Sequence, residues 1–387
     1  MCGIVGYIGQ KQAAPILMEG LQKLEYRGYD SAGIAIYSEK EIVVKKFKGR
    51  LMVLADHLDH QPVPGILGLG HTRWATHGEP NDINAHPHSS FHGNIAVVHN
   101  GIVENYLKLK DWLISQGISF KSETDTEVIA HLIEFYYEGD LVQAVKQAIQ
   151  RMEGAYAIGV ICKDQPDTLI GYRKDSPLVV GIGKGENFIA SDIPALLKYT
   201  RDVYFLEDGE MAVLTEGTVQ LLDELGDLVI RDPFHVTWDI ESAEKGGYPH
   251  FMLKEMFEQP RAVRDTLSPR INEHHQVLLT ELRLNREEID HFNKIIIVAC
   301  GTAMHAGLVG KYAIEKLARI PVEVAIASEF RYNDPFVDDR TLLIAVSQSG
   351  ETADTLAALR EAKSKGAHVL TVTNVVGSRI SREAHDV

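Results

Sequence analysis

Residues 1–9 read MCGIVGYIG, an apolar run that ends in glycine. A run of this length and composition is typical of a buried strand. The residues that follow carry a helical pattern in which Ile16, Leu17, Leu21 and Leu24 share one face. We therefore predict a strand followed at once by a helix that packs on it.

The rest of the first half alternates apolar runs with turn residues. Four runs after Ser31 favour strands, and they read AGIAIY, IVVKKFKG, ILGLGHTRW and NIAVVHNG. Two later segments, 124–138 and 140–152, have helical periodicity instead. The first half is therefore predicted to combine β-sheets with packed helices.

The pattern changes after about residue 290, where short apolar strands alternate with helical stretches at 303–318 and 352–365. Alternation of this kind indicates a parallel α/β sheet. Between the halves, residues 243–249 are charged and contain Gly-Gly and Pro, which is typical of a linker. We predict a first domain at 1–240, a linker with lead-in helices at 241–289, and a second domain at 290–387.

The composition is that of a folded globular protein with an acidic balance. Of 387 residues, 45% are hydrophobic and 24% are charged, and the formal net charge is -15. An acidic chain without a cluster of Lys and Arg argues against nucleic acid as a partner. Three widely spaced cysteines exclude a disulfide framework and fit a reducing cytoplasm. No run reaches the roughly 18 to 20 apolar residues of a membrane span, so we expect neither membrane insertion nor secretion.

Cys2 is the first candidate for chemistry. Removal of Met1, which is favoured when the next residue is small, would leave Cys2 with an unblocked α-amine. An α-amine has an ordinary pKa of about 7.7 to 8.0, so it can accept the thiol proton directly or through a water. The alternative is that Cys2 is a small buried apolar residue of the first strand.

Five motifs in order favour the chemical role. They read MCGIVGYIG at 1–9, LEYRGYDSAG at 24–33, GHTRWATHGEPNDINAHPH at 70–88, VVHNGIVEN at 97–105 and SETDTEV at 122–128. This part of the chain resembles the class II glutamine amidotransferase domain of the glucosamine-6-phosphate synthase family. The resemblance is dense over residues 1–130 and thinner to 240. It implies an N-terminal-nucleophile amidohydrolase fold, an αββα sandwich, which releases ammonia from glutamine at Cys2.

The resemblance also implies roles for residues of the glutamine site. Attack on the amide creates an oxyanion that needs preorganised donors, and these correspond to the Asn100 side chain and the Gly101 backbone N–H. Taken alone, an Asn-Gly pair indicates a hairpin turn. The carboxylate and ammonium of glutamine need a cation and an anion, which correspond to Arg73 and Asp125.

A covering loop and a group of histidines complete the first half. The loop with Trp74, Thr76 and His77 resembles the segment that covers glutamine, and Trp74 holds the position associated with gating of ammonia. The alternative for Trp74 is an ordinary buried tryptophan. Histidines at positions 71, 77, 86, 88, 92 and 99 could suggest a metal site. No cysteine lies beside them and no HExxH spacing occurs, so we expect no metal, and the resemblance implies none. We expect no cofactor either.

Two junctions of the second half, IIIVACGTAMHAG at 295–307 and TLLIAVSQSGETADT at 341–355, lead from a strand into a helix. Backbone N–H groups and hydroxyls at such a point can hold a phosphate, although Ser and Thr are also common N-caps. The string SQSGET resembles the phosphate loop of the sugar isomerase (SIS) domains of the same family, which are parallel α/β/α folds. That resemblance assigns phosphosugar contacts to Thr302, Ser347, Gln348, Ser349 and Thr352. Ala303 departs from the serine of many relatives, and Cys300 is expected to be structural.

The two resemblances together imply transfer of the amide nitrogen of glutamine to fructose 6-phosphate, which gives glucosamine 6-phosphate and glutamate. They also imply a homodimer for the full-length protein. Family members continue beyond SREAHDV at 381–387, so we expect a C-terminally truncated chain with an incomplete SIS domain. One alternative is another class II amidotransferase, such as a phosphoribosyl transferase or asparagine synthetase, with a different downstream domain. A second alternative is a non-catalytic sugar-phosphate sensor, which would lack the nucleophile or an oxyanion residue.

Overall fold

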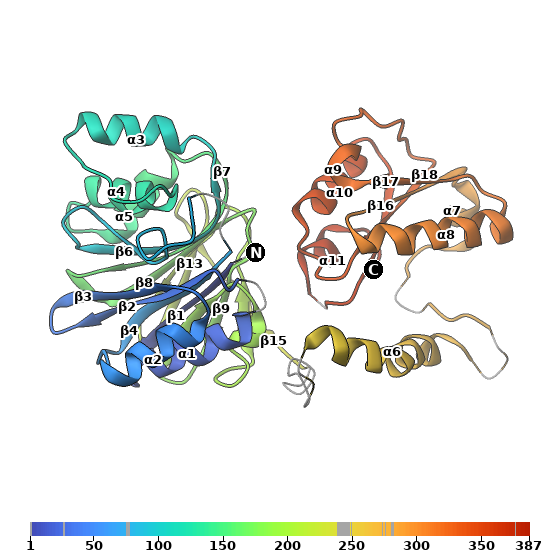
Figure 1. Cartoon of the computed structure of the whole chain (residues 1–387). Coiled ribbons are helices and arrows are strands. Elements are labelled where there is room, and N and C mark those ends of the chain that lie inside the picture. Colours follow the sequence, from blue (N-terminus) through green and yellow to red (C-terminus); the bar gives the residue numbers. More distant parts are fainter. Residues whose placement is uncertain are drawn as a thin grey trace. The chain divides into compact units, whose positions relative to one another are not determined.

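The computed structural model describes residues 2–25, 28–74, 78–237, 248, 250–272, 274, 276–279, 282–375 and 377–387. The chain divides into two units, Met1–Gly246 and Gly247–Val387 (Figure 1). Within the described residues, no helix has the length and apolar character needed to cross a bilayer.

The first unit contains two antiparallel sheets. The first sheet has the order β15-β11-β9-β10-β1-β4-β2-β3. Its strands are β1 (Gly3–Gly9), β2 (Ser31–Ser38), β3 (Glu41–Lys48), β4 (Leu67–Arg73), β9 (Val179–Ile182), β10 (Glu186–Ala190), β11 (Asp202–Phe205) and β15 (Phe234–His235). The second sheet has the order β14-β13-β12-β8-β7-β6-β5. Its strands are β5 (His88–Ser89), β6 (Ile95–Val103), β7 (Gly154–Cys162), β8 (Gln165–Lys174), β12 (Met211–Leu214), β13 (Val219–Leu222) and β14 (Leu228–Val229).

Helices cover the outer face of each sheet (Figure 1). The first sheet carries α1 (Ala13–Leu24) and α2 (Leu51–His60), and the second carries α3 (Tyr106–Ser115), α4 (Thr126–Phe135) and α5 (Leu141–Ile149). A separate core fills the space between the sheets, and it includes Ile4, Leu69, Val98, Ala157 and Ile189. This order of layers confirms the predicted αββα sandwich.

The strand β1 explains why the first apolar run shows no alternation of polar residues. It lies in the middle of its sheet, paired with β10 on one side and β4 on the other. Ile4 and Ile8 pack in the core between the sheets, whereas Val5 and Tyr7 pack in the core that contains α1. Since both faces are covered, every position of the run favours an apolar side chain or glycine. The predicted strand and helix at the start of the chain are both confirmed.

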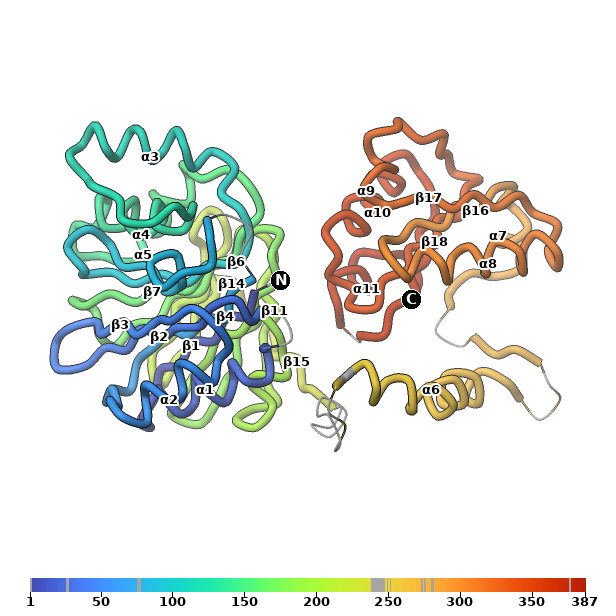
Figure 2. The backbone as a smooth tube through the Cα atoms, in the orientation of Figure 1, coloured from blue at the N-terminus to red at the C-terminus, as the bar shows by residue number. Residues whose placement is uncertain are grey.

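The second unit is built on a parallel sheet with the strand order β17-β16-β18-β19. Its strands are β16 (Lys294–Ala299), β17 (Val322–Ile326), β18 (Thr341–Ser347) and β19 (His368–Thr373). Helices α8 (Thr302–Ala318), α9 (Ala327–Phe330), α10 (Ala353–Ser364) and α11 (Arg379–Glu383) pack around this sheet, and α6 (Phe251–Leu267) and α7 (Arg286–His291) precede it. The trace in Figure 2 shows β16, β17 and β18 each leading into the next helix.

Alternate residues of β16 divide the core of this unit into two layers. Ile295 and Ile297 pack with Ile314 of α8, whereas Ile296 and Val298 pack with α9, α10 and α11. Helices therefore cover both faces of a parallel sheet, as predicted for the second half.

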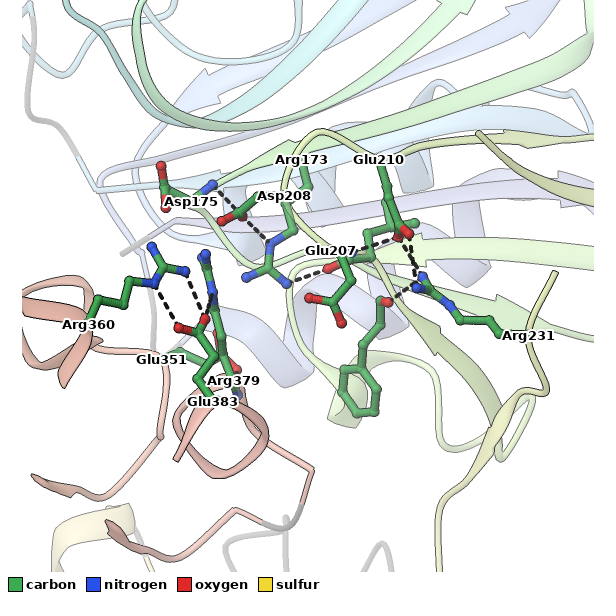
Figure 3. Close-up of polar contacts among 12 residues, drawn as sticks. Arg173, Asp175, Glu207, Asp208, Glu210, Arg231, Glu351, Arg360, Arg379 and Glu383 are labelled. Atoms are coloured by element: carbon green, nitrogen blue, oxygen red, sulfur yellow. Dashed lines mark hydrogen bonds and ion pairs between the residues drawn. The ribbon is translucent and has the colours of Figure 1, made fainter. Parts of the chain in front are cut away.

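Ion pairs connect segments in the C-terminal part of each unit (Figure 3). In the first unit, Arg231 donates to both carboxylate oxygens of Glu210, at 3.0 and 2.5 Å. In the second unit, Arg360 of α10 donates to both oxygens of Glu383 at 2.7 and 2.8 Å, and Arg379 adds a third bond at 2.9 Å. Burial raises the pKa of Glu383, but the two arginines outweigh this effect and leave the pKa below its ordinary value. The paired charges connect α10 to α11.

Candidate active site

Strand pairing places Cys2 beside the end of β4. Gly3 of β1 pairs with Thr72 of β4, so the residue before β1 lies next to the residues that follow Thr72. The Trp74 backbone N–H donates to Cys2 Sγ at 3.2 Å, and the thiol lies 3.5 Å from the Trp74 carbonyl oxygen. Cys2 is partly exposed and is not in a disulfide. The alternative of a buried apolar strand residue is therefore wrong.

Asn100 meets Cys2 from the other sheet. It lies in β6, is 7% exposed, and its Nδ2 donates to the Cys2 carbonyl oxygen at 3.0 Å. The Asn100 Oδ1 atom lies 3.0 Å from His71 Nε2. The amide that sequence reasoning assigned to the oxyanion is thus held beside the candidate nucleophile.

Gly101 does not form the hairpin turn that an Asn-Gly pair indicates by itself. It continues β6 and pairs with Tyr156 of β7. Its φ is +125°, and an added Cβ would lie 2.0 Å from the Ala155 carbonyl oxygen. The glycine is required because only a residue without Cβ fits this backbone conformation so close to the neighbouring strand.

Arg73 and Asp125 form a buried cation and anion near Cys2. Arg73 is the last residue of β4, is 4% exposed, and donates to the Gly78 carbonyl oxygen at 3.4 Å. Burial lowers the pKa of the Arg73 guanidinium, and electrostatic interactions with Cys2, Asp125 and Asp30 oppose this shift. Asp125 precedes α4, and its Oδ2 accepts the Val103 backbone N–H at 2.9 Å. The structure therefore places two buried groups of opposite charge close enough to interact.

Trp74 differs from an ordinary core tryptophan because it is 44% exposed. Its ring packs edge-on against Tyr29, with 5.2 Å between the centroids. A Cβ added to Gly28 would lie 2.7 Å from the Arg73 carbonyl carbon, so glycine allows the two segments to pass closely. Thr76 and His77, which sequence reasoning also assigned to this loop, lie outside the described residues.

The buried histidines bind hydroxyl groups and one amide. Thr126 Oγ1 lies 2.9 Å from His99 Nδ1 and 3.2 Å from His86 Nε2, and Thr124 Oγ1 lies 3.1 Å from His88 Nε2. Among the described residues, no group of three or more His, Cys, Asp or Glu side chains is arranged to hold a metal ion. Burial lowers the pKa values of His86 and His88 well below the ordinary value. The imidazoles of His86 and His88 are therefore neutral, and they pack beside the site.

Sequence reasoning assigned no role in the glutamine site to four residues that contact or support it. They are Gly28, Tyr29, Asp30 and His71. All four lie in motifs that were recognised, LEYRGYDSAG and GHTRW, so the motifs themselves were the available signal. Assigning individual roles required the contacts between strands, which the sequence does not show.

The second unit places its two predicted phosphate junctions at one edge of the sheet. Thr302 starts α8 after β16, and residues 348–352 follow β18, which is the neighbouring parallel strand. Carboxyl ends of adjacent parallel strands form the usual ligand edge of an open α/β sheet. Thr355 Oγ1 donates toward Cys300 Sγ at 4.0 Å, which links the two junctions.

The SQSGET loop is folded on its own hydroxyl groups. Ser347 is 3% exposed, and its Oγ accepts the Gly350 N–H at 3.0 Å and lies 3.0 Å from Thr352 Oγ1. Ser349 Oγ accepts the Glu351 N–H at 3.2 Å, whereas the Gln348 side chain is exposed. Gly350 has φ of +68°, the left-handed conformation that glycine tolerates best. The loop is therefore a compact turn that leads into α10.

Two protein families match this chain, one in each unit. The family described as a glutamine amidotransferase domain matches residues 71–198, and the family described as an SIS domain matches residues 288–387. The fold and these matches define a class II glutamine amidotransferase domain joined to SIS-domain sequence.

Curated relatives are similar to the chain over its full length. The glutamine–fructose-6-phosphate aminotransferase (isomerizing) of Clostridium tetani is 61% identical over 387 residues, which are 100% of this chain and 64% of that protein. The protein of the same name from Thermus thermophilus is 52% identical, with 100% and 63% covered. The chain is a homologue of the glutamine–fructose-6-phosphate aminotransferases and spans about 64% of their length.

The fold also has a counterpart among solved structures. The glutamine phosphoribosylpyrophosphate (PRPP) amidotransferase from B. subtilis, complexed with ADP and GMP, is 20% identical, with a TM-score of 0.53. The similarity covers 96% of this chain and 81% of that chain. At this identity the similarity concerns the fold alone, and the SIS match disfavours a phosphoribosyl transferase as the downstream domain.

Proposed function

We propose that the first domain hydrolyses glutamine with Cys2 as the nucleophile. The observation that carries this proposal is the convergence at Cys2 of two strands from different sheets. The Trp74 N–H approaches the sulfur at 3.2 Å, and the Asn100 amide reaches the Cys2 carbonyl oxygen at 3.0 Å. A nucleophile with a preorganised amide donor beside it is the arrangement that acyl transfer requires.

The reaction needs one base, which the α-amine of Cys2 provides after removal of Met1. The thiol proton passes to this amine, directly or through a water, and Sγ attacks the side-chain amide carbon of glutamine. The carbonyl oxygen becomes an oxyanion stabilised by Asn100 Nδ2 and the Gly101 N–H. Return of the proton to the leaving nitrogen expels ammonia and leaves a thioester on Cys2. Water then hydrolyses the thioester to glutamate and restores the thiol.

Selection of glutamine follows from the charges around the nucleophile. We assign the α-carboxylate of glutamine to Arg73 and its ammonium to Asp125, since both are buried and their charges act on one another. Trp74, Thr76 and His77 are assigned to the loop that covers the substrate, with Trp74 controlling the passage of ammonia.

For the whole protein we propose transfer of the released ammonia to fructose 6-phosphate, which gives glucosamine 6-phosphate. The names of the homologues and the SIS match support this assignment. The five phosphosugar contacts are proposed for Thr302, Ser347, Gln348, Ser349 and Thr352. This chain would supply the glutaminase half-reaction and part of the sugar-phosphate site.

The remaining assignments follow from the same homology. We propose a homodimer for the full-length protein and no role for nucleic acid, metal or cofactor. A cytoplasmic location agrees with three cysteines that form no disulfide.

Two measurements test the proposed function. Glutamine hydrolysis should be lost in Cys2→Ala and kept in Cys162→Ala, which removes a buried thiol of the core. Hydrolysis that survives Cys2→Ala would refute the nucleophile. If fructose 6-phosphate raises the thermal stability of the protein while the wild type releases no ammonia, the chain is a sensor and not an amidotransferase.

A further inference from the structure

We propose that His71 is a positioning residue that fixes the orientation of the Asn100 amide, an inference that rests on the proposed hydrolysis at Cys2. His71 lies in β4 with its side chain completely buried. Its Nε2 atom is 3.0 Å from two oxygens, the backbone carbonyl of His99 and Oδ1 of Asn100. His71 therefore connects the strand that ends at Arg73 with the strand that carries the oxyanion donors.

The backbone carbonyl determines which nitrogen of His71 carries the hydrogen. A carbonyl oxygen can only accept, so Nε2 must be protonated and must donate to His99. The same N–H faces the side chain of Asn100, which must therefore present Oδ1 and not its NH₂ group. This turns Nδ2 toward Cys2, whose carbonyl oxygen accepts its hydrogen bond at 3.0 Å.

The surroundings keep His71 in this single neutral form. Burial lowers its pKa to about 3, although the hydrogen bonds to Asn100 and His99 oppose the shift. Nδ1 is buried and has no hydrogen-bond partner within the described part of the chain, so a second proton would create an unsolvated charge. The ring stacks on His86 with 4.2 Å between centroids, which restricts its rotation. His71 is thus a fixed donor that takes no proton from the thiol.

Loss of this donor would release the amide. Without it, only the Cys2 carbonyl oxygen still opposes a half-turn of Asn100 that would present Oδ1 to the oxyanion. Removal of one oxyanion donor lowers kcat by about 10²- to 10³-fold in comparable enzymes. The hydrogen bond from Asn100 to the oxyanion forms in the transition state and not with bound glutamine. Its loss should therefore lower kcat and change KM little.

A matched pair of substitutions separates the donor from the volume of the side chain. Glutamine places its amide nitrogen near the position of Nε2, whereas the nitrogen of asparagine reaches only as far as Nδ1. We expect kcat for glutamine hydrolysis to fall about 30- to 300-fold in His71→Asn and to stay within about fivefold of wild type in His71→Gln. His57→Phe removes an imidazole on α2, outside the site, and should leave kcat unchanged.

A second readout distinguishes positioning from damage to the fold. The Cys2 thiol adds to the aldehyde of glutamate γ-semialdehyde: a C–S bond forms, and the carbonyl electron pair moves to the oxygen, which receives the thiol proton. This adduct uses the oxyanion donors, whereas norvaline, which keeps the α-carboxylate and ammonium but has no side-chain carbonyl, cannot. His71→Asn should therefore weaken binding of the aldehyde by the same factor as kcat/KM and leave the affinity for norvaline within about twofold.

The possible outcomes are distinct. The inference is overturned if His71→Asn and His71→Gln have similar kcat values, or if both ligands weaken equally. If His71→Asn does not fold, a loss of more than about 30-fold in folded His71→Gln overturns it, because the donor is retained there. A wild type that releases no ammonia would instead contradict the proposed function.

Discussion

Replacement of Gly101 by alanine tests the link between strand geometry and chemistry. The new Cβ would lie 2.0 Å from the Ala155 carbonyl oxygen and 2.7 Å from the Tyr156 Cα, which are backbone atoms that cannot rotate away. To reach 3.0 Å, β6 and β7 would have to separate by about 1 Å at this point. A displacement of about 1 Å in a catalytic group can cost roughly 100-fold in rate. We therefore expect kcat for glutamine hydrolysis to fall about 100-fold in Gly101→Ala.

Stability provides an independent measure of the same change. A non-glycine residue in the left-handed region costs about 1 to 2 kcal/mol, and the clash adds to this. Gly93→Ala is a matched control, because Gly93 has φ of +79° and no atom within 4 Å of its added Cβ. It should lose only about 1 kcal/mol and keep full activity.

The assay can isolate the first unit. Residues 247–387 contain no tryptophan, so tryptophan fluorescence during urea unfolding does not report on the second unit. Gly101→Ala should unfold at a clearly lower urea concentration than Gly93→Ala. Equal midpoints together with unchanged kcat would show that the backbone contact at Ala155 does not set the oxyanion geometry.

Three other predictions concern charge, pH and the sugar-phosphate loop. Asp125→Ala should raise the KM for glutamine about 10- to 100-fold, because it removes a charge-assisted hydrogen bond of about 1.5 to 3 kcal/mol. Asp125→Asn should raise the KM equally but keep the stability of the protein, because its amide oxygen still accepts the Val103 N–H. An unchanged KM in both variants would contradict the glutamine assignment. Burial lowers the pKa of His71 to about 3 and the pKa values of His86 and His88 well below the ordinary value. Below about pH 6.5 the unfolded chain therefore binds more protons than the folded chain. The free energy of unfolding, measured with urea and fluorescence, should fall as the pH falls, by up to about 1.4 kcal/mol per pH unit for each histidine. A free energy of unfolding that does not change between about pH 6.5 and 4.5 would refute this. Ser347→Ala removes the acceptor of the Gly350 N–H and should lower the affinity for fructose 6-phosphate, measured by calorimetry, about tenfold. Ser364→Ala, at the end of α10, should leave this affinity unchanged. Equal affinities in the two variants would exclude Ser347 from the site.

The long apolar elements were predictable because burial on two faces leaves little choice of residue. The strands β1 and β16 and the helix α4 all lie where the pattern of the sequence places them. The sequence pattern does not predict the late strands of the first unit, since elements such as β14 (Leu228–Val229) are two residues long and too short for any periodicity.

Some residues of the candidate site are predictable from the sequence and others are not. Cys2, Arg73, Asn100 and Asp125 could be proposed because each lies in a distinctive motif, although the Asn-Gly pair alone predicted a turn. The structure has a strand there because the left-handed glycine fits the β7 backbone. The position of His71 against Asn100 depends on packing between two sheets, which local patterns do not encode.

The pairing of β1 on both sides has a consequence for any change in chain length near the nucleophile. A shift of one residue would move Val5 and Tyr7 from the core that contains α1 to the core between the sheets. It would also move residue 2 by about 3.3 Å along the strand. Single insertions or deletions within residues 3–9 should therefore abolish activity even where a substitution is tolerated. Natural variation and laboratory engineering can alter the composition of this segment but not its length.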